Sequence, residues 1–378
     1  MRITTTATLA LLAATQPGSL RAQDNLFPQG SAVAGVEARQ YSFGSGFAVD
    51  KLRQVAFPVG VLVPVGKRFS FDIGSNYAIT TVVRPASAGG SQSFSNITDT
   101  QIRGSYVLGR DALVVSVMMN LPTGEETTTL SKFNVASSAS SNFLLFPVNS
   151  YGSGFSITPG VAAAASAGEW NLGLAASVRV SSTYSPFSDS ASKSVRYQPG
   201  VETRIRGGVD RLVGASRLTM GLTFSTFSND ELRGGAFGNG AFDPGNRFLI
   251  DLGLLSPVGG GTVGFYLWDY HRSPSGNSGT SGSTPGTREN VFTAGVSGSF
   301  RLSPKLTLEP VAEARIWSPE SGTGNLFGAG TALQIELSKQ FSFVPGARLD
   351  LGNIRAPGAA KSNSITGWDL TALLRYGF

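Results

Sequence analysis

The sequence of 378 residues contains no cysteine, one histidine and few charged residues, which make up 14% of the chain. Disulfide bonds are therefore excluded, and so are zinc sites built on cysteine and histidine, which take three or four such ligands. Every histidine-dependent hydrolase scheme would have to use His271, and spacing assigns it no serine or aspartate partner. We expect no enzyme activity, no catalytic residues, no metal and no cofactor.

Clustered positive charge is also missing. Lysine and arginine exceed aspartate and glutamate by 30 to 24, but they are spread singly along the chain. Nucleic-acid-binding surfaces need a basic patch or stripe, so no nucleic-acid partner is predicted. With 41% apolar residues, the chain does not belong to the disordered class either.

Long apolar runs are absent after the first residues. Arg2 precedes an apolar stretch at 7–14, and the small residue Ala22 follows, which is the arrangement of a signal peptide cleaved after Ala22. We expect a signal peptide at 1–22 and a single domain at 23–378. Within that domain the most tempting run, 57–65, contains two prolines and falls far short of the ~20 residues of a membrane helix. A closed β-barrel is the other structure that satisfies its own backbone inside a bilayer.

The sequence shows strict alternation instead of long runs. From Trp368 to Phe378 every second residue is apolar or aromatic, and the positions between include Asp369, Thr371 and Arg375. A period of two is typical of strands whose two faces meet different surroundings. We identify sixteen such segments, at 33–43, 52–63, 69–83, 98–108, 112–121, 152–166, 170–180, 195–209, 217–228, 247–256, 262–272, 290–301, 305–317, 327–337, 341–352 and 366–378. A count of fourteen stays open, because the first segment is the weakest and 262–272 carries aromatics on both faces.

The connections between these segments alternate in length. Gaps such as 109–111, 167–169 and 210–216 are short, whereas 84–97 and 122–151 are long and polar. Transmembrane barrels have short turns in the periplasm and long loops outside, and a soluble sandwich gives no reason for that asymmetry. The sequence predicts an all-β protein, a transmembrane antiparallel up-and-down β-barrel of about sixteen strands with short periplasmic turns and long extracellular loops.

The last strand carries a family resemblance. It ends in LLRYGF, with Leu374, Tyr376 and a terminal Phe378 on one face, and resembles the C-terminal signal of Gram-negative outer-membrane proteins. The resemblance implies residence in the cell outer membrane, contact with its lipid and lipopolysaccharide, and recognition of this strand by the barrel assembly machinery. The segment VMMNLPTG at 117–124 more weakly resembles outer-membrane proteins related to the uptake of aromatic compounds and fatty acids.

The long connection 122–151 lies between the fifth and sixth predicted strands. Its place is similar to that of the loop that folds inward and narrows the pore in the general porins, which implies a constriction loop here. The porin loop is acidic, whereas this one is rich in apolar side chains, so we expect an apolar constriction. The candidate constriction residues are Phe133, Phe143, Leu144, Leu145 and Phe146.

Charged residues recur on the polar faces of the predicted strands. An arginine or lysine that faces lipid costs ~2–4 kcal/mol at the middle of the bilayer, so these side chains must face a lumen. Two interpretations are compatible with each other: ion pairs that rigidify the wall, and fixed charges that select solutes. Three of the arginines, Arg204, Arg206 and Arg217, are expected near the turn end, where they would make the periplasmic mouth positive. The candidate lumen-lining residues are Asp72, Asp99, Arg103, Arg179, Glu202, Arg204, Arg206, Arg217, Asp251, Glu309, Glu313, Arg315, Glu336, Arg348, Asp350, Asp369 and Arg375.

Strand number connects this fold to a function. Barrels of 16 to 18 strands leave an aqueous channel unless they are plugged. We therefore predict an outer-membrane channel for passive or weakly selective passage of small solutes, including hydrophobic or aromatic ones. Two alternatives stay open: a non-conducting barrel that acts through its extracellular loops in adhesion or structure, and a barrel enzyme that uses His271. Association into a homo-oligomer is also left open.

Overall fold

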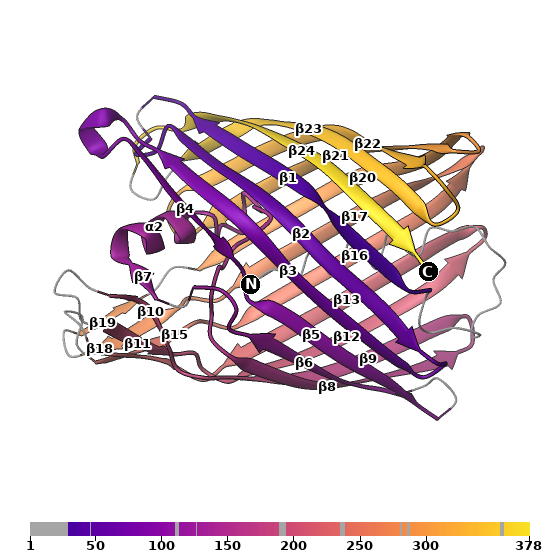
Figure 1. Cartoon of the computed structure of the whole chain (residues 1–378), viewed down its shortest axis with the longest axis horizontal. Coiled ribbons are helices and arrows are strands. Elements are labelled where there is room, and N and C mark those ends of the chain that lie inside the picture. The colour runs from indigo at the N-terminus through magenta and orange to yellow at the C-terminus, as the bar shows by residue number, and fades with distance from the viewer. Residues whose placement is uncertain are drawn as a thin grey trace.

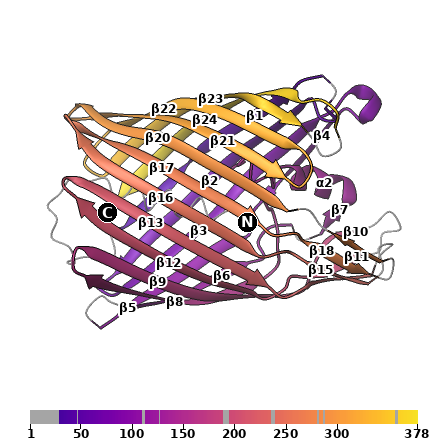
Figure 2. The ribbon, with the colours of Figure 1, turned by 180° about the vertical axis from the view of Figure 1, so that it is seen from behind.

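Long tilted strands run around a barrel in both side views of the molecule (Figures 1 and 2). The computed structural model describes residues 29–45, 47–109, 113–125, 127–188, 194–234, 239–279, 282–285, 288–355 and 359–378. The predicted signal peptide at 1–22 lies outside the described residues. The C-terminus lies at the end of the barrel where the short turns are, on the right in Figure 1.

Within the described residues the barrel has sixteen strand positions, which confirms the predicted fold. Each strand pairs antiparallel with the next, and the last pairs with the first from Ser31 opposite Gly377 to Phe43 opposite Ile365, so the barrel is closed. The strands are β1 Ser31–Phe43, β2 Lys51–Val65, β3 Phe69–Val83, β4 Ser91–Ile97 with β5 Thr100–Leu108, β6 Leu113–Leu121, β8 Ser156–Ala167, β9 Trp170–Ser181, β12 Glu202–Val213, β13 Ser216–Phe227, β16 Arg247–Val258, β17 Gly261–Arg272, β20 Glu289–Ser303, β21 Leu306–Pro319, β22 Thr323–Glu336, β23 Phe341–Arg355 and β24 Asn363–Gly377.

The fourth strand position is divided into two pieces. β5 pairs with the first half of β3, and β4 pairs with its second half, from Tyr77 opposite Ile97 to Val83 opposite Ser91. The sequence predicted a single strand at 98–108 and a loop at 84–97, and the second half of that loop is strand, preceded by the 3-10 turn Ala86–Ala88. The interruption at 98–99 explains why the alternation could not be followed across it.

Adjacent residues on the strands meet opposite surroundings. On β23 the side chain of Leu349 is 68% exposed, while its neighbour Asp350 is 1% exposed. Leu370 on β24 is likewise exposed and Asp369 buried. A band of exposed leucine, valine and phenylalanine side chains on the outside of a closed barrel matches the hydrocarbon of a bilayer. The charged rows consequently lie on the inner face.

The turns at one end of the barrel are tight. Val213 pairs with Ser216, and Ala167 pairs with Trp170, so two residues make each connection. Gly214 in the first turn has φ +61°, a left-handed conformation that the favoured two-residue hairpin turns require. The sequence predicted a connection at 210–216, and the observed turn is shorter because β12 continues to Val213. Asp210 therefore lies within the strand, where its carboxylate pairs with Arg217 at 2.7 Å.

At the other end the long connections extend beyond the barrel as a second sheet. Among the described residues it has seven short strands: β7 Thr128–Thr129, β10 Tyr184–Ser188, β11 Ser194–Gln198, β14 Asp230–Arg233, β15 Gly240–Asp243, β18 Gly276–Gly279 and β19 Gly282–Pro285. The predicted strand at 195–209 is therefore wrong in extent, since its first residues belong to β11 and the barrel strand begins at Glu202. Pro199 and Gly200 separate the two, because proline cannot donate a ladder hydrogen bond.

Helical structure is sparse. Besides the short turn at 86–88, the described residues form one helix, α2 Leu130–Ser138, which begins where the Thr129 hydroxyl accepts a hydrogen bond from the Lys132 amide. Among the described residues, no helix has both the length and the apolar character needed to cross a bilayer.

The alternation of faces gives a matched test on β8. Ala163 pairs with Leu174, which is 62% exposed on the outer face, whereas Ala162 pairs with Ala175 on the inner face. We expect Ala163→Arg to lower the free energy of unfolding by about 2–4 kcal/mol, because it places a guanidinium in lipid near mid-strand. Ala162→Arg should cost much less. Urea titration of both variants in lipid vesicles measures the difference, and equal losses would contradict this assignment of faces.

Candidate functional site

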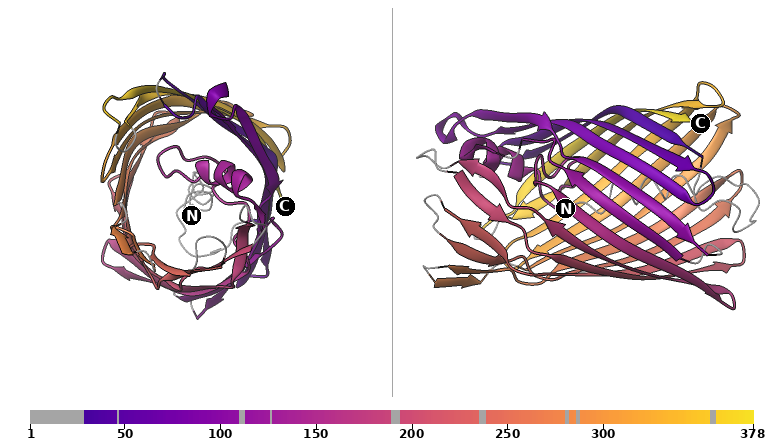
Figure 3. Two further views of the ribbon diagram at one scale, coloured as in Figure 1. Left: turned by 90° about the vertical axis from the view of Figure 1, so that its left-hand side faces the viewer. Right: turned by 60° about the horizontal axis from the view of Figure 1, so that its bottom comes forward.

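The connection between β6 and β8, described at 122–125 and 127–155, is called the inward loop from here on, because the part after its helix lies against the inner face of the barrel. The end-on view shows helix α2 within the ring of strands (Figure 3). This helix packs against β3 and β4. The chain after the helix, from Phe143 to Tyr151, is mostly buried, and it runs over the inner faces of β20–β24 and β1–β3, called the covered wall.

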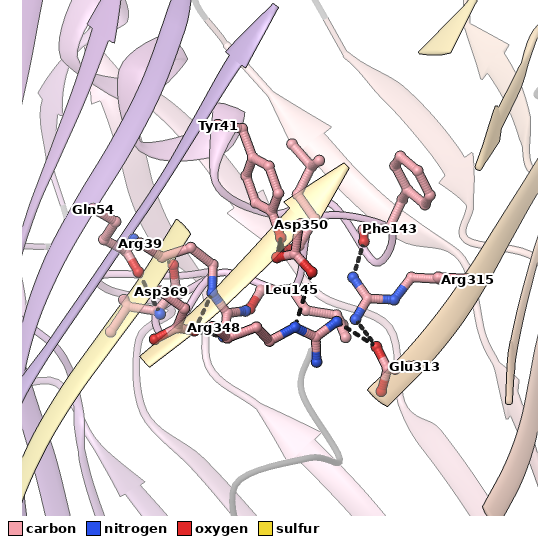
Figure 4. A network of polar contacts seen from close by, with 12 residues as sticks. Arg39, Tyr41, Gln54, Phe143, Leu145, Glu313, Arg315, Arg348, Asp350 and Asp369 are labelled. Carbon is pink, nitrogen blue, oxygen red and sulfur yellow. Dashed lines mark hydrogen bonds and ion pairs between the residues drawn. The ribbon is translucent and has the colours of Figure 1, made fainter. Parts of the chain in front are cut away.

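The first strand holds two consecutive carbonyl groups of the inward loop. The Tyr41 hydroxyl donates to the carbonyl oxygen of Leu144 at 3.1 Å, and the Arg39 guanidinium donates to that of Leu145 (Figure 4). Leu145 has φ +52°, and among the described residues it is the non-glycine residue in the left-handed region. That conformation is uncommon for a bulky residue, and it turns two successive carbonyls toward one strand.

Two further side chains of the wall bind the same segment. Gln54 on β2 donates to the Val148 carbonyl at 2.7 Å and accepts from the Val148 amide at 2.7 Å, so its amide group pairs with the loop backbone as a neighbouring strand would. Arg315 on β21 donates to the Phe143 carbonyl. A buried carbonyl without a partner is costly, and the covered wall supplies partners where the loop has no regular structure of its own.

The same arginines belong to a network of ion pairs on the covered wall. Arg39 pairs with Asp369, and Arg315 pairs with Glu313. Arg348 joins the network at two points, at 2.8 Å from Asp350 and 3.0 Å from Glu313 (Figure 4). The hydroxyl of Tyr266 on β17 also donates to Glu313 at 2.9 Å. Buried charges are tolerated only when they are paired and hydrogen-bonded, and here each carboxylate has an arginine.

Aromatic packing fixes the side chains of the inward loop against the wall. The ring of Phe143 stacks on Trp317 with centroids 5.8 Å apart, and Phe146 meets Tyr41 edge-on at 5.6 Å. Phe143 and Phe146 are 1% and 0% exposed, and Leu144 is buried as well. The structure differs here from the expected apolar constriction, because these apolar side chains face the wall, where contact with water is least.

The fifth candidate constriction residue lies elsewhere. Phe133 is on α2 and packs against Phe187 of β10 at 4.8 Å, in the sheet beyond the barrel. The resemblance to porins implied a constriction at 143–146. In the structure this segment is attached to one side of the lumen.

Asp99 ties the two ends of the inward loop together. Its carboxylate accepts hydrogen bonds from the Gly124 amide at 3.1 Å and from the Ser153 amide and hydroxyl at 2.7 and 3.0 Å. Asn120 adds a fourth at 2.8 Å. Gly124 lies where a Cβ would stand 2.1 Å from the Tyr151 carbonyl oxygen, so only glycine allows this approach. Asp99, a candidate lumen residue, thus also positions the loop.

The inner faces of β5, β6, β8, β9, β12, β13, β16 and β17 form the other side of the lumen, called the open wall. The ion pair between Arg206 and Asp251, 2.9 Å apart, is accessible, with side chains 43% and 35% exposed. Under the inward loop the corresponding values for Arg315 and Glu313 are 4% and 9%. Water therefore reaches the first pair and is excluded from the second.

Two of the three arginines predicted at the periplasmic mouth are placed differently. Arg204 is opposite Ser225 and Arg206 opposite Thr223, toward the long loops and the middle of the strands, and only Arg217 is near the turn. Each has a carboxylate partner, Glu202, Asp251 and Asp210 respectively. The displacement follows from the extension of β12 to Val213, which moves the turn away from Arg206.

The remaining candidate residues lie on inward rows of the strands. Arg103 pairs with Asp72 at 2.8 Å, and Arg179 lies opposite Glu202. The last three follow the same alternation in the turn-side half of the covered wall; they are Glu309, Glu336 and Arg375. Their roles in solute selection remain predictions.

His271 and the apolar row of the C-terminal strand lie on the outer surface. His271 pairs with Phe248, whose side chain is exposed on the outer face, and the two rings are 6.3 Å apart. At the turn end, Tyr376 stacks between Phe341 at 4.6 Å and Phe378 at 5.7 Å. Leu374 is exposed in the same row. Within the described residues, no group of three or more histidine, aspartate or glutamate side chains could hold a metal ion.

Comparisons with known proteins found similar solved structures but no matching family. No family model and no curated protein matches the sequence. Similar solved structures include an outer-membrane channel from Pseudomonas putida F1, 13% identical with a TM-score of 0.38 over 95% of this chain and 100% of that one. A Pseudomonas aeruginosa FadL homologue is 8% identical, with a TM-score of 0.47 over 93% and 90%. An anion-selective porin from Comamonas acidovorans is 12% identical, with a TM-score of 0.40 over 92% and 98%.

The geometry of the chain itself defines its class. It has an even number of antiparallel strands, tight turns at one end, long connections at the other, an apolar outer band and a charged interior. These are the properties of transmembrane β-barrels of the outer-membrane type.

The role of Asp99 can be tested by hydrogen exchange. Asp99→Ala removes a charged acceptor, and bonds of this kind contribute about 1.5–3 kcal/mol each. We expect the Gly124 and Ser153 amides to exchange at least about ten-fold faster, since 1.4 kcal/mol corresponds to a factor of ten, while the barrel strands keep their protection. Asp72→Ala, which breaks a wall ion pair away from the loop ends, serves as the control. Equal acceleration in both variants would count against the assignment.

Proposed function

We propose that the protein is an outer-membrane channel for the passive passage of small solutes. One observation carries the proposal: the inward loop is bound to the covered wall, and charged side chains at the middle of the open wall stay accessible to water. Arg206 and Asp251 show this accessibility at mid-barrel. A sixteen-stranded barrel has an interior wider than its own side chains fill, and a loop fixed to one side leaves a path along the other.

The attachments of the inward loop support a fixed partition. Its backbone is bound by Arg39, Tyr41, Gln54 and Arg315, which come from three different strands. To swing the loop away, all of these bonds and the stacked Phe143 would have to be released together. We therefore infer a channel of constant width, whose selectivity comes from the charges of the open wall.

The proposal includes the surroundings of the barrel. The outer row of exposed side chains, such as Leu349 and Leu370, would contact membrane lipid, with lipopolysaccharide on the side of the long loops. The row of Leu374, Tyr376 and Phe378 would be the strand that the assembly machinery recognises. Several barrels could associate through their outer faces.

Conductance through planar bilayers tests the proposal. Because the chain has no cysteine, a single introduced thiol is a unique label. Ala175 faces inward opposite Arg206, and its neighbour Ala176 faces outward opposite Ile205. We expect a steady current from the unmodified protein. A charged methanethiosulfonate reagent should reduce that current in Ala175→Cys and leave it unchanged in Ala176→Cys.

A different outcome would favour the second candidate. The long loops form a sheet beyond the barrel, from β7 to β19. In a barrel that acts through its extracellular surface, this sheet would be the part that makes the contacts. Correctly folded protein that gives no current at any voltage would reject the channel and support that alternative.

A further inference from the structure

Two adjoining hollows lie in the open wall on the side of the long loops. The larger is lined by Glu202, Arg204, Thr223, Ser225, Arg247 and Tyr270, with Phe248 and Leu249 beside them. The smaller shares Glu202 and Arg204 and adds Arg179. Five neighbouring strands, β9, β12, β13, β16 and β17, supply these side chains, so the site is built on rigid elements.

Positive charge is in excess in these hollows. Among the described residues that line them, three guanidinium groups, Arg179, Arg204 and Arg247, accompany a single carboxylate, Glu202. Glu202 is bonded to Arg204 at 2.6 Å and lies opposite Arg179. Another carboxylate of this wall, Asp251, is paired with Arg206 at 2.9 Å.

Two hydroxyl groups of the larger hollow, those of Ser225 and Thr223, act as acceptors. Ser225 accepts a hydrogen bond from Arg204 Nε at 3.2 Å, and Thr223 accepts one from Arg206 at 2.8 Å. A hydroxyl that accepts in this way keeps its own O–H for another acceptor. Arg247 is held by the ring of Phe227, 4.4 Å from its guanidinium carbon, and its buried Nε has no hydrogen-bond partner among the described residues.

The lining of the larger hollow also has an apolar side. Leu249 and the ring of Tyr270 line it, and Tyr270 belongs to the inward row of β17 that also contains Trp268 and Tyr266. A solute that fits both sides has an anionic group for the guanidinium and hydroxyl donors and a hydrocarbon or aromatic body for Leu249 and Tyr270. Arginine binds carboxylates with a matched pair of donors.

We propose that this part of the open wall binds small organic carboxylates with an aromatic or aliphatic body, as a station on their passage through the barrel. This inference rests on the proposed channel function and names its solute class. Inorganic anions would use the arginines but leave the apolar side unfilled, and neutral aromatics would bring no negative charge to the guanidinium groups.

Titration calorimetry of the detergent-solubilised full-length protein with benzoate measures binding independently of conduction. We expect Arg247→Gln to weaken benzoate binding at least about ten-fold and Glu202→Gln, which leaves an acceptor for Arg204, to strengthen it. Changes of opposite sign cannot come from misfolding. Arg217→Gln is the control, since Arg217 lies outside both hollows, and it should stay within about two-fold of the unmodified protein. Acetate and benzyl alcohol should each bind more weakly than benzoate.

The outcomes separate the site from the channel. No benzoate heat with the unmodified protein, or equal affinities in Arg247→Gln and Arg217→Gln, would overturn the carboxylate site, even if the barrel conducts. Benzoate binding with the expected pattern in a barrel that carries no current would leave the site standing and reject the channel. Binding of benzyl alcohol as tight as that of benzoate would show that the apolar side alone is recognised, and would also overturn the inference.

Discussion

The structure depends on one requirement, that every backbone polar group within the bilayer finds a partner in the chain itself. The pairing of β1 with β24 meets it, because it removes the two free edges of the sheet. Closure also creates an interior separated from lipid. Residues such as Leu349 and Asp350 can then stand side by side in sequence and lie in opposite environments.

The same requirement governs the inward loop, which has left the sheet and lost its ladder partners. Side chains of the wall bind four of its carbonyl groups instead, those of Phe143, Leu144, Leu145 and Val148. Arginine suits this task because one guanidinium has five donors. Arg39 and Arg315 each serve a loop carbonyl and a carboxylate at once, so the buried charges and the loop backbone satisfy one another.

Alternation along the sequence was sufficient to predict the barrel, since a period of two is a local property of each strand. It failed where local signals changed, as at the interruption 98–99 in the fourth strand position and at Pro199 and Gly200 before β12. The site was predicted only in part. Asp369 and Arg315 were recognised as inward charges, but Arg39, Tyr41 and Gln54 were missed. Their partners lie about a hundred residues away in the loop, and no spacing in the sequence indicates such a contact.

The two walls differ because carbonyl groups of the inward loop accept hydrogen bonds from the side chains of the covered wall. On the covered wall, the guanidinium groups of Arg39 and Arg315 are occupied by loop carbonyls and by Asp369 and Glu313. Among the described residues of the open wall, Arg204 bonds to Glu202 and Ser225 instead of loop carbonyls, and the buried Nε of Arg247 has no hydrogen-bond partner. Attachment of the loop to one side therefore leaves the guanidinium groups of the open wall without loop carbonyls as partners. In the proposed channel, an anionic solute would move along that side of the lumen.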